Sequence, residues 1–283
     1  MPIDQRPLTF RTSFDQAAQD YDMVRPGYPP ALIEDIVSFA AIPANGRILE
    51  VGCGTGQATI PFAQRGYQMT CLDIGPALAA LAVQNCRPYP NVQVHVSAFE
   101  DWPGTPNTFD LVMAATAFHW IPPEIGYPKA ARLLKDTGAL AIFSNEHPTP
   151  AAGFFTDVQR IHQQVVPEWP DPTTGPTIEA QIEAHIAATV AAIHATQLFT
   201  PATVKTYPWA QTYTASAYVR LLNTYSNYRN LEAHKRTQLF QGITELIENK
   251  YGGIITKEYL AILYLAKKRP RVSDGRARAF RRD

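Results

Sequence analysis

The sequence predicts an α/β fold: a doubly wound, mostly parallel seven-stranded sheet with a helical cap. Two observations carry this prediction. Between residues 47 and 144, short apolar runs alternate with longer helical patterns, which is typical of β-α-β units and a parallel sheet. Beyond residue 200, two further segments have strand composition and are expected to return to the same sheet.

In the first half of the chain, strands are expected at residues 47–51, 68–73, 92–96, 109–114 and 139–143. Helices are expected at residues 56–66, 77–86 and 124–134. The first of these ends at Gly66, which suits a helix C-cap, and the last stops before the turn signal Thr137-Gly138.

Beyond Asn145 the pattern changes, because prolines interrupt the chain and helices predominate. Helical patterns cover residues 154–166, 178–196, 215–225 and 231–250, and strand patterns cover residues 204–213 and 259–266. We therefore expect four parts: an N-terminal lid (1–30), a ligand-binding core (31–146), a helical cap with the last two strands (147–266) and a basic tail (267–283).

Composition limits the class of protein. A chain of 283 residues with 46% hydrophobic content can bury a full core. It has no uninterrupted apolar stretch of about 18 residues, and its N-terminus lacks the apolar region of a secretory signal. The odd number of cysteines (Cys53, Cys71 and Cys86) argues against a disulfide framework or a zinc cluster. We expect a cytoplasmic protein with free thiols.

Charge is unevenly distributed. Residues 267–283 hold eight of the 25 basic and two of the 25 acidic residues, which leaves 17 basic and 23 acidic residues, a net charge of about −6, in the rest. An acidic body argues against nucleic-acid binding. The basic tail is read as a disordered terminus, with a nucleic-acid or membrane arm as the alternative.

The strongest local signal is the segment Ile48-Leu-Glu50-Val-Gly52-Cys-Gly54-Thr-Gly56, an apolar run followed by three alternating glycines. Glycine permits a positive φ and close approach of a ligand to the backbone. In open α/β sheets, ligands bind at the carboxyl end of such a strand, beside a helix N-terminus.

The spacing of these glycines excludes two nucleotide motifs. The dinucleotide pattern G-x-G-x-x-G would need glycine where Gln57 or Thr59 stands, and no Gly-Lys-Ser/Thr follows as a P-loop requires. Glu50 would also repel a pyrophosphate, whereas it suits a ligand ammonium group. A nicotinamide-dependent oxidoreductase therefore stays only an alternative.

A second carboxylate, Asp73, ends the next predicted strand, about twenty residues after the glycines, where an acid can accept hydrogen bonds from both ribose hydroxyls. The alternative is that Asp73 serves only as a helix N-cap before Pro76.

Together, Glu50 to Gly56, Asp73, Phe109-Asp110-Leu-Val and Phe118-His119-Trp120 resemble class I S-adenosyl-methionine-dependent methyltransferases, over roughly residues 21–143. The resemblance is nearest to the small-molecule branch that includes trans-aconitate and quinone-precursor methyltransferases. The segment Tyr21-Asp22-x-x-Arg25-Pro26-x-Tyr28-Pro29 supports this, because similar segments in that branch fold over the cofactor.

The resemblance implies S-adenosyl-methionine as cofactor and a Rossmann-like methyltransferase fold. The implied cofactor contacts are Glu50, Gly52, Gly54, Gly56, Asp73, Ile74, Phe99, Ala115, Tyr21 and Arg25. Relatives often carry Gly-Asp-Ala after the third strand, whereas this chain has Ser97-Ala98-Phe99, so adenine contacts are expected from the Phe99 backbone.

One candidate for catalysis is His119, just after the fourth predicted strand. It titrates near neutral pH and could act as a base or orient the acceptor, and the alternative is a structural or cofactor-lining histidine. Phe118 and Trp120 are expected to wall the site or to belong to the core. Methyl transfer from a sulfonium depends mainly on alignment and water exclusion, so a dedicated catalytic residue is not required.

Other candidates stay open. Arg25 could bind a carboxylate of the cofactor or acceptor, or simply fix a proline turn at the surface. No metal site is expected, because His147 neighbours only Glu146, and His185 and His194 are nine residues apart. An aromatic series lines either an acceptor pocket or the cap core: Tyr207, Trp209, Tyr213, Tyr218, Tyr225 and Tyr228.

The sequence thus predicts a methyltransferase acting on a small-molecule acceptor by in-line displacement, with no nucleic-acid or membrane partner, as a monomer or homodimer. The acceptor atom stays open. The alternatives are the oxidoreductase, a methyltransferase-fold protein that binds the cofactor without turnover, and methylation of proteins or nucleic acids.

Overall fold

The structure is a computed structural model that describes residues 15–148, 153–170 and 175–270, and over these residues the chain forms one seven-stranded sheet in the order β3-β2-β1-β4-β5-β7-β6. Its strands are β1 (Arg47–Val51), β2 (Gln68–Asp73), β3 (Val92–Val96), β4 (Phe109–Ala115), β5 (Leu134–Glu146), β6 (Thr203–Thr214) and β7 (Ile254–Lys267). Strands β1 to β5 are parallel, whereas β7 runs antiparallel to both β5 and β6. The doubly wound, mostly parallel sheet is confirmed.

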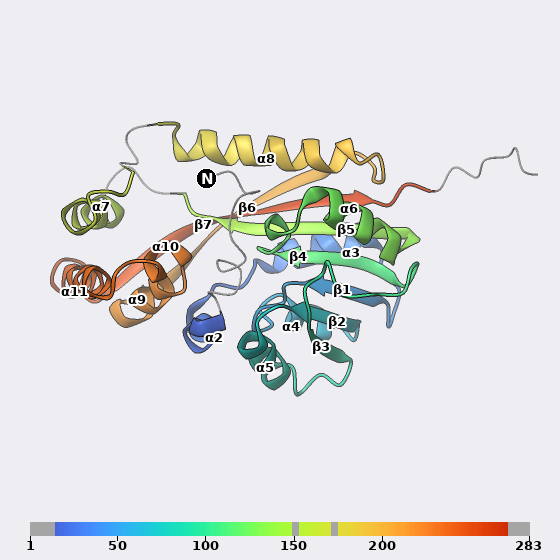
Figure 1. Ribbon diagram of the computed structural model, residues 1–283, viewed down its shortest axis with the longest axis horizontal. Helices are drawn as coiled ribbons and strands as arrows, with labels where there is room; N and C mark the ends of the chain where they lie inside the picture. Colours follow the sequence, from blue (N-terminus) through green and yellow to red (C-terminus); the bar gives the residue numbers. More distant parts are fainter. Residues whose placement is uncertain (1–14, 149–152, 171–174, 271–283) are drawn as a thin grey trace, which may run out of the picture.

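Helices cover both faces of the sheet. Those in the first half are α2 (Ala18–Val24), α3 (Pro30–Ala40), α4 (Thr59–Ala63), α5 (Pro76–Asn85) and α6 (Pro123–Leu133), with short 3₁₀ turns η2 (Asp15–Ala17) and η3 (Phe118–Trp120). Helices α3 and α4 pack on one face, and α6 and α8 (Ile178–Ala195) pack on the other. Figure 1 shows α8 lying along the sheet over β5, β6 and β7.

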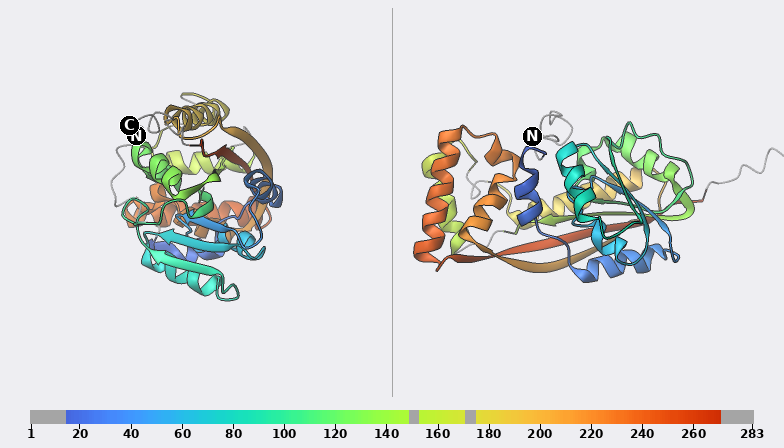
Figure 2. Two further views of the ribbon diagram at one scale, coloured as in Figure 1. Left: turned by 90° about the vertical axis from the view of Figure 1, so that its right-hand side faces the viewer. Right: turned by 90° about the horizontal axis from the view of Figure 1, so that it is seen from below.

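The remaining helices form a lobe at one end of the sheet: α7 (Phe154–Val165), α9 (Ala215–Asn223), α10 (Ser226–Arg229) and α11 (Ala233–Lys250). They pack around the outer ends of β6 and β7, which extend beyond the other strands (Figure 2). Strand β5 pairs only with residues 260–267 of β7. Residues 254–259 of β7 therefore pair with β6 alone. The two long strands therefore join the lobe to the sheet.

Four features differ from the sequence expectation. Strand β5 begins at Leu134 rather than at residue 139, so the expected turn at Thr137-Gly138 lies inside the strand. The helix after the glycine loop begins at Thr59 rather than near Gly56, because the loop occupies the intervening residues. Strand β7 begins at Ile254, where buried and exposed residues alternate, and only its second half is buried on both faces. Lys267 lies in β7 and Lys268 bridges to Phe199, so the tail begins later than expected. The tail's remaining expected residues, 271–283, lie outside the described residues.

No helix in the described ranges is long and apolar enough to cross a membrane. Cys53, Cys71 and Cys86 all lie in the described part of the chain, where they are buried and free.

Candidate active site

The glycine loop leaves β1 in a conformation that requires glycine at two positions. Gly52 and Gly54 have φ values of +72° and +56°, which other residues adopt only with strain. A Cβ on Gly52 would lie 2.4 Å from the Ala117 Cβ. The Gly52 and Cys53 amides both donate to the Leu72 carbonyl, at 2.8 and 2.9 Å, so the loop is fixed against β2.

Asp73, at the end of β2, is hydrogen-bonded to this loop. Its Oδ2 accepts from the Gly54 amide and its Oδ1 from the Gly75 amide, each at 2.8 Å. The N-cap alternative for Asp73 is wrong, because the first amides of α5, Ala77 and Leu78, donate instead to Asp15 Oδ1. Asp73 is thus an oriented carboxylate in the wall of a cavity.

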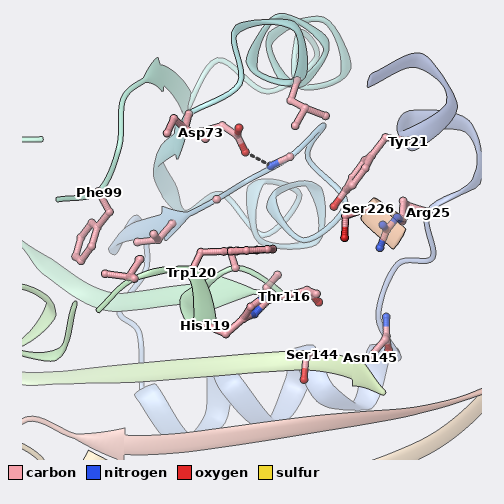
Figure 3. Close-up of a pocket in the computed structure, with 18 of the residues that line it drawn as sticks. Tyr21, Arg25, Asp73, Phe99, Thr116, His119, Trp120, Ser144, Asn145 and Ser226 are labelled. Carbon is pink, nitrogen blue, oxygen red and sulfur yellow. Dashed lines mark hydrogen bonds between the residues drawn. The ribbon is translucent and has the colours of Figure 1, made fainter. Parts of the chain in front are cut away.

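That cavity, of about 660 Å³, opens along the carboxyl ends of the parallel strands. Figure 3 places Asp73 on one wall, with Phe99 at one end and Tyr21, Arg25 and Ser226 at the other. The Phe99 end is largely apolar and is lined by Leu72, Ile74, Leu78, Ala98, Phe99 and Ile121. The opposite end lies between the sheet, helix α2 and the lobe. It is polar because Tyr21, Arg25 and Ser226 line it.

Glu50 lies beneath the glycines, in a smaller cavity that adjoins the first. It is fully buried, its Oε2 accepts a hydrogen bond from Thr59 Oγ1, and its Oε1 has no partner within the described residues. Burial raises the pKa of Glu50 to about 8. A buried carboxyl group with one unsatisfied oxygen suits a positively charged ligand group.

The N-terminal segment closes the polar end. Tyr21 and Arg25 line both cavities, and Tyr28 lines the smaller one, with its hydroxyl 2.8 Å from Thr116 Oγ1. The Arg25 guanidinium donates to Thr224 Oγ1 at 2.8 Å and to the Thr224 carbonyl oxygen at 3.0 Å. The alternative of a surface arginine is wrong, since Arg25 ties the N-terminal segment to the lobe.

His119 lies on η3 and lines the larger cavity beside Trp120, with the two ring centroids 5.0 Å apart. Ala115, at the end of β4, also lines this cavity. Phe118 points instead into the core, where it contacts Tyr127. The two aromatic neighbours of His119 therefore have different roles, which the sequence left open.

The end of β5 adds residues that the sequence reasoning did not identify. Asn145 and His147 line both cavities. Burial, with the nearby cations Lys257 and Arg25, lowers the pKa of His147 to about 3, so its imidazole is neutral at pH 7. The position of His147 at the end of a parallel strand, following the Ala139 to Phe143 apolar run, was the signal that could have found it.

The lobe contributes Tyr225, Ser226 and Asn227 to the larger cavity, and α8 contributes His185. Of the aromatic series considered from the sequence, Tyr225 lines the cavity, whereas Tyr213, Tyr218 and Tyr228 belong to the lobe core. A spacing pattern could not separate these roles, because the helical pattern of residues 215–225 includes Tyr225, whereas in the structure Tyr225 lies in the bend between α9 and α10.

Most of the predicted site residues meet at this place. The larger cavity is lined by Tyr21, Arg25, Gly52, Gly54, Asp73, Ile74, Phe99, Ala115 and His119, and the smaller one by Glu50. Gly56 lines neither, and its Cα faces Cys86, whose sulfur would be 3.4 Å from an added Cβ. Among the described residues, no group of three or more His, Cys, Asp or Glu side chains could hold a metal ion.

Comparison with known proteins relates the first half of the chain to methyltransferases. Residues 48–138 match the methyltransferase-domain family. An uncharacterized methyltransferase of Mycobacterium tuberculosis is 32% identical over 138 residues, 47% of this chain and 52% of that protein. The malonyl-[acyl-carrier protein] O-methyltransferase of Geobacter sulfurreducens is 32% identical over 150 residues, 50% and 55% of the two chains. The chain thus aligns with about half the length of these relatives.

Two solved structures share the fold. A candidate type II methyltransferase from Anaeromyxobacter dehalogenans superposes with a TM-score of 0.62 at 19% identity, over 87% of this chain and 99% of that chain. A phosphoethanolamine N-methyltransferase from Haemonchus contortus, solved with phosphomonomethylethanolamine and S-adenosylhomocysteine, gives 0.51 at 16% identity, over 93% and 60%. The lobe residues of the cavity lie outside the segment that matches the family.

Proposed function

Residues 48–138 match the methyltransferase-domain family, and from this premise we propose that the chain is a class I enzyme that transfers a methyl group from S-adenosyl-methionine to a small-molecule acceptor. The chain spans about half the length of the curated relatives that it matches.

The observation that carries the proposal is the pairing of the glycine loop with Asp73. Two positive-φ glycines leave the floor of the cavity free of side chains, and the Gly54 amide fixes one oxygen of the Asp73 carboxylate. The remaining lone pairs of that carboxylate can accept from two vicinal ribose hydroxyls. The apolar end, with Ile74 and Phe99, suits an adenine ring.

The cavities also fit the rest of the cofactor. A volume of about 660 Å³ lies within the range of cofactor-sized sites. The unsatisfied Glu50 Oε1 would gain a partner from the cofactor's ammonium group. Arg25 lines the same smaller cavity and would meet the cofactor's carboxylate. Gly56 lies outside both cavities, so its predicted part is to permit the turn into α4.

When bound, S-adenosyl-methionine supplies an electrophilic methyl group on a sulfonium. The chain's own part is to align the two reactants and exclude water. Tyr21 and Tyr28, with the lobe residues, cover the polar end. His119 lines the cavity between its two ends and is proposed to orient the acceptor or accept its proton. A carboxylate acceptor would need no base.

Calorimetry with S-adenosyl-homocysteine tests cofactor binding. Gly54→Ala, whose Cβ would come 3.2 Å from the Tyr21 ring, is expected to weaken binding at least tenfold. Gly66→Ala is a matched control, because it has a similar positive φ of +82° and open space around it. Equal affinity of both variants, or no binding to the wild type, would refute the proposal.

Turnover is tested separately. Incubation with methyl-labelled cofactor and a metabolite extract should give a labelled small molecule, whereas persistent absence of a labelled product would favour a cofactor-binding protein without turnover. We also propose that the protein is cytoplasmic and acts as a monomer or homodimer. Residues 1–30 are the proposed lid, of which residues 1–14 lie outside the described residues, and residues 147–266 are the proposed helical cap with the last two strands.

A further inference from the structure

The lobe side of the larger cavity holds a buried hydroxyl group that the cofactor does not require. Tyr225 follows α9 and lines the cavity. Its hydroxyl oxygen is buried and has no hydrogen-bond partner within the described residues. A buried hydroxyl without a partner is unfavourable, so a bound group is the natural source of the missing partner.

Two cations lie near this wall of the cavity, Arg25 beside Tyr225 and Lys257 on the side of His147. The Arg25 guanidinium lies 4.6 Å from the centroid of the Tyr225 ring. Lys257, on β7, is only 7% exposed and forms no ion pair in the described part of the chain, where its Nζ lies 5.1 Å from the Tyr259 ring and 5.2 Å from the Phe155 ring. Burial lowers the pKa of Lys257 to about 8, so it is still mostly protonated at pH 7.

His147 completes this wall. Its ring lies 5.7 Å from the Tyr225 ring and 5.3 Å from the Tyr259 ring, between centroids. Because burial and the charges of Lys257 and Arg25 keep it neutral, it can donate one N–H without adding a charge. The wall therefore combines two neutral donors, the Tyr225 hydroxyl and the His147 N–H, with the positive charge of Lys257 nearby.

Two carboxylates line the larger cavity, Glu146 and Asp73, and each is held by a hydrogen bond to another part of the chain. Glu146 Oε1 accepts from Ser144 Oγ, and alternation along β5 places Ser144 and Glu146 on the opposite face of the strand from Asn145. Asp73 lies at the end of β2, against the glycine loop. In Figure 3, Arg25 and Ser226 lie together at the lobe end, across the cavity from Phe99.

We propose that Tyr225 and His147 form the acceptor subsite, and that the methyl acceptor carries an anionic oxygen group, a carboxylate or a phosphate ester. The Tyr225 hydroxyl donates to this group and His147 donates beside it, while Lys257, on the side of His147, favours its charge. This inference rests on the proposed function, since it names the acceptor class for the same cavity. Tyr225 is then a residue that positions the acceptor.

The first test measures ligand class on the full chain saturated with S-adenosyl-homocysteine. The probes are succinate and propane-1,2,3-tricarboxylate, with succinamide as the neutral match, and glycerol 2-phosphate, with glycerol as its neutral match. At least one anionic probe should bind at least tenfold more tightly than its neutral match. Preference for the carboxylates or for the phosphate identifies the source of the charge. No preference for any anion overturns the proposal.

The second test uses two tyrosines of the lobe. Tyr225→Phe removes the unpartnered hydroxyl, so the affinity for the anionic probe should fall about tenfold or more, while the thermal midpoint stays the same or rises. Tyr228→Phe is the matched control, because the Tyr228 hydroxyl lies 2.8 Å from His162 Nε2 and outside the cavity. It should lower the midpoint and leave the affinity unchanged. Unchanged anion affinity in Tyr225→Phe overturns the proposal.

The affinity for S-adenosyl-homocysteine distinguishes a failure of the acceptor subsite from a failure of the proposed function. It should agree within about twofold between the wild type and Tyr225→Phe, since the hydroxyl is assigned to the acceptor. If the wild type binds this cofactor analogue and shows no anion preference, the inference fails and the proposed function stands. If the wild type does not bind it, the proposed function fails first.

Discussion

Replacing Glu50 by glutamine tests the electrostatics beneath the glycine loop. Glu50 is fully buried, and burial raises its pKa from 4.5 to about 8. A carboxyl group whose folded pKa is raised stabilises the fold fully below its unfolded pKa, and this stability is lost as the pH rises through the folded value. The neutral glutamine does not titrate, so Glu50→Gln should remove this dependence.

The magnitude follows from the two pKa values. A shift of about 3.5 units corresponds to about 5 kcal/mol over the whole range, of which about 3 kcal/mol falls between pH 5.5 and pH 8.5. Without cofactor, the wild type should therefore lose about 3 kcal/mol of unfolding free energy relative to Glu50→Gln across that interval.

Urea unfolding followed by tryptophan fluorescence at pH 5.5, 6.5, 7.5 and 8.5 measures this difference. Glu183→Gln, on an exposed position of α8, is the control and should run parallel to the wild type. Parallel curves for the wild type and Glu50→Gln would refute the reasoning, because they would mean that the buried carboxyl group titrates alike in the folded and unfolded chain.

Four further predictions concern the cavity and the residues around it. If the cofactor's ammonium pairs with Glu50, binding at pH 7 should release close to one proton, seen as a dependence of calorimetric enthalpy on the buffer; equal enthalpies in buffers of different ionisation heat would contradict it. Lys257→Met should raise the pKa of His147, measured by NMR titration of its imidazole, because a nearby cation is removed. The same variant should gain up to about 3 kcal/mol of stability at pH 7, since the lowered pKa of Lys257 marks an unfavourable buried charge; a loss of stability would contradict it. Thr224→Val should cost about 1–3 kcal/mol, measured by urea unfolding, because it leaves Arg25 without the Thr224 Oγ1 acceptor; a neutral result would show that the contact is replaceable.

The half of the site that is proposed to hold the cofactor could be predicted from the sequence, because its residues are close together in the chain. Glu50, Gly52 and Gly54 belong to one loop, and Asp73 ends the next strand, so the parallel order of β1 and β2 brings them together. The N-cap alternative for Asp73 could not be dismissed from the sequence, since Asp15 supplies that cap from 62 residues away.

The half of the site that is proposed to bind the acceptor could not be predicted from the sequence. His147, His185 and Tyr225 come from a strand end, a helix on the other face and the lobe, and no common spacing links them. The first half of β7 joins the lobe to the sheet. Exposed and buried residues alternate there, and the sequence pattern of this part did not indicate a strand. Arg25 reaches its partner Thr224 over 199 residues.

By itself, the sequence determined the doubly wound sheet, the glycine loop and the carboxylates at the ends of β1 and β2, because strand periodicity and glycine conformation are local properties. Only the tertiary structure decided which aromatic and histidine side chains face the cavity and which face the core. Those roles depend on how β6 and β7 extend past the sheet and carry the lobe against the N-terminal segment. Long-range packing of this kind leaves no fixed spacing in the chain.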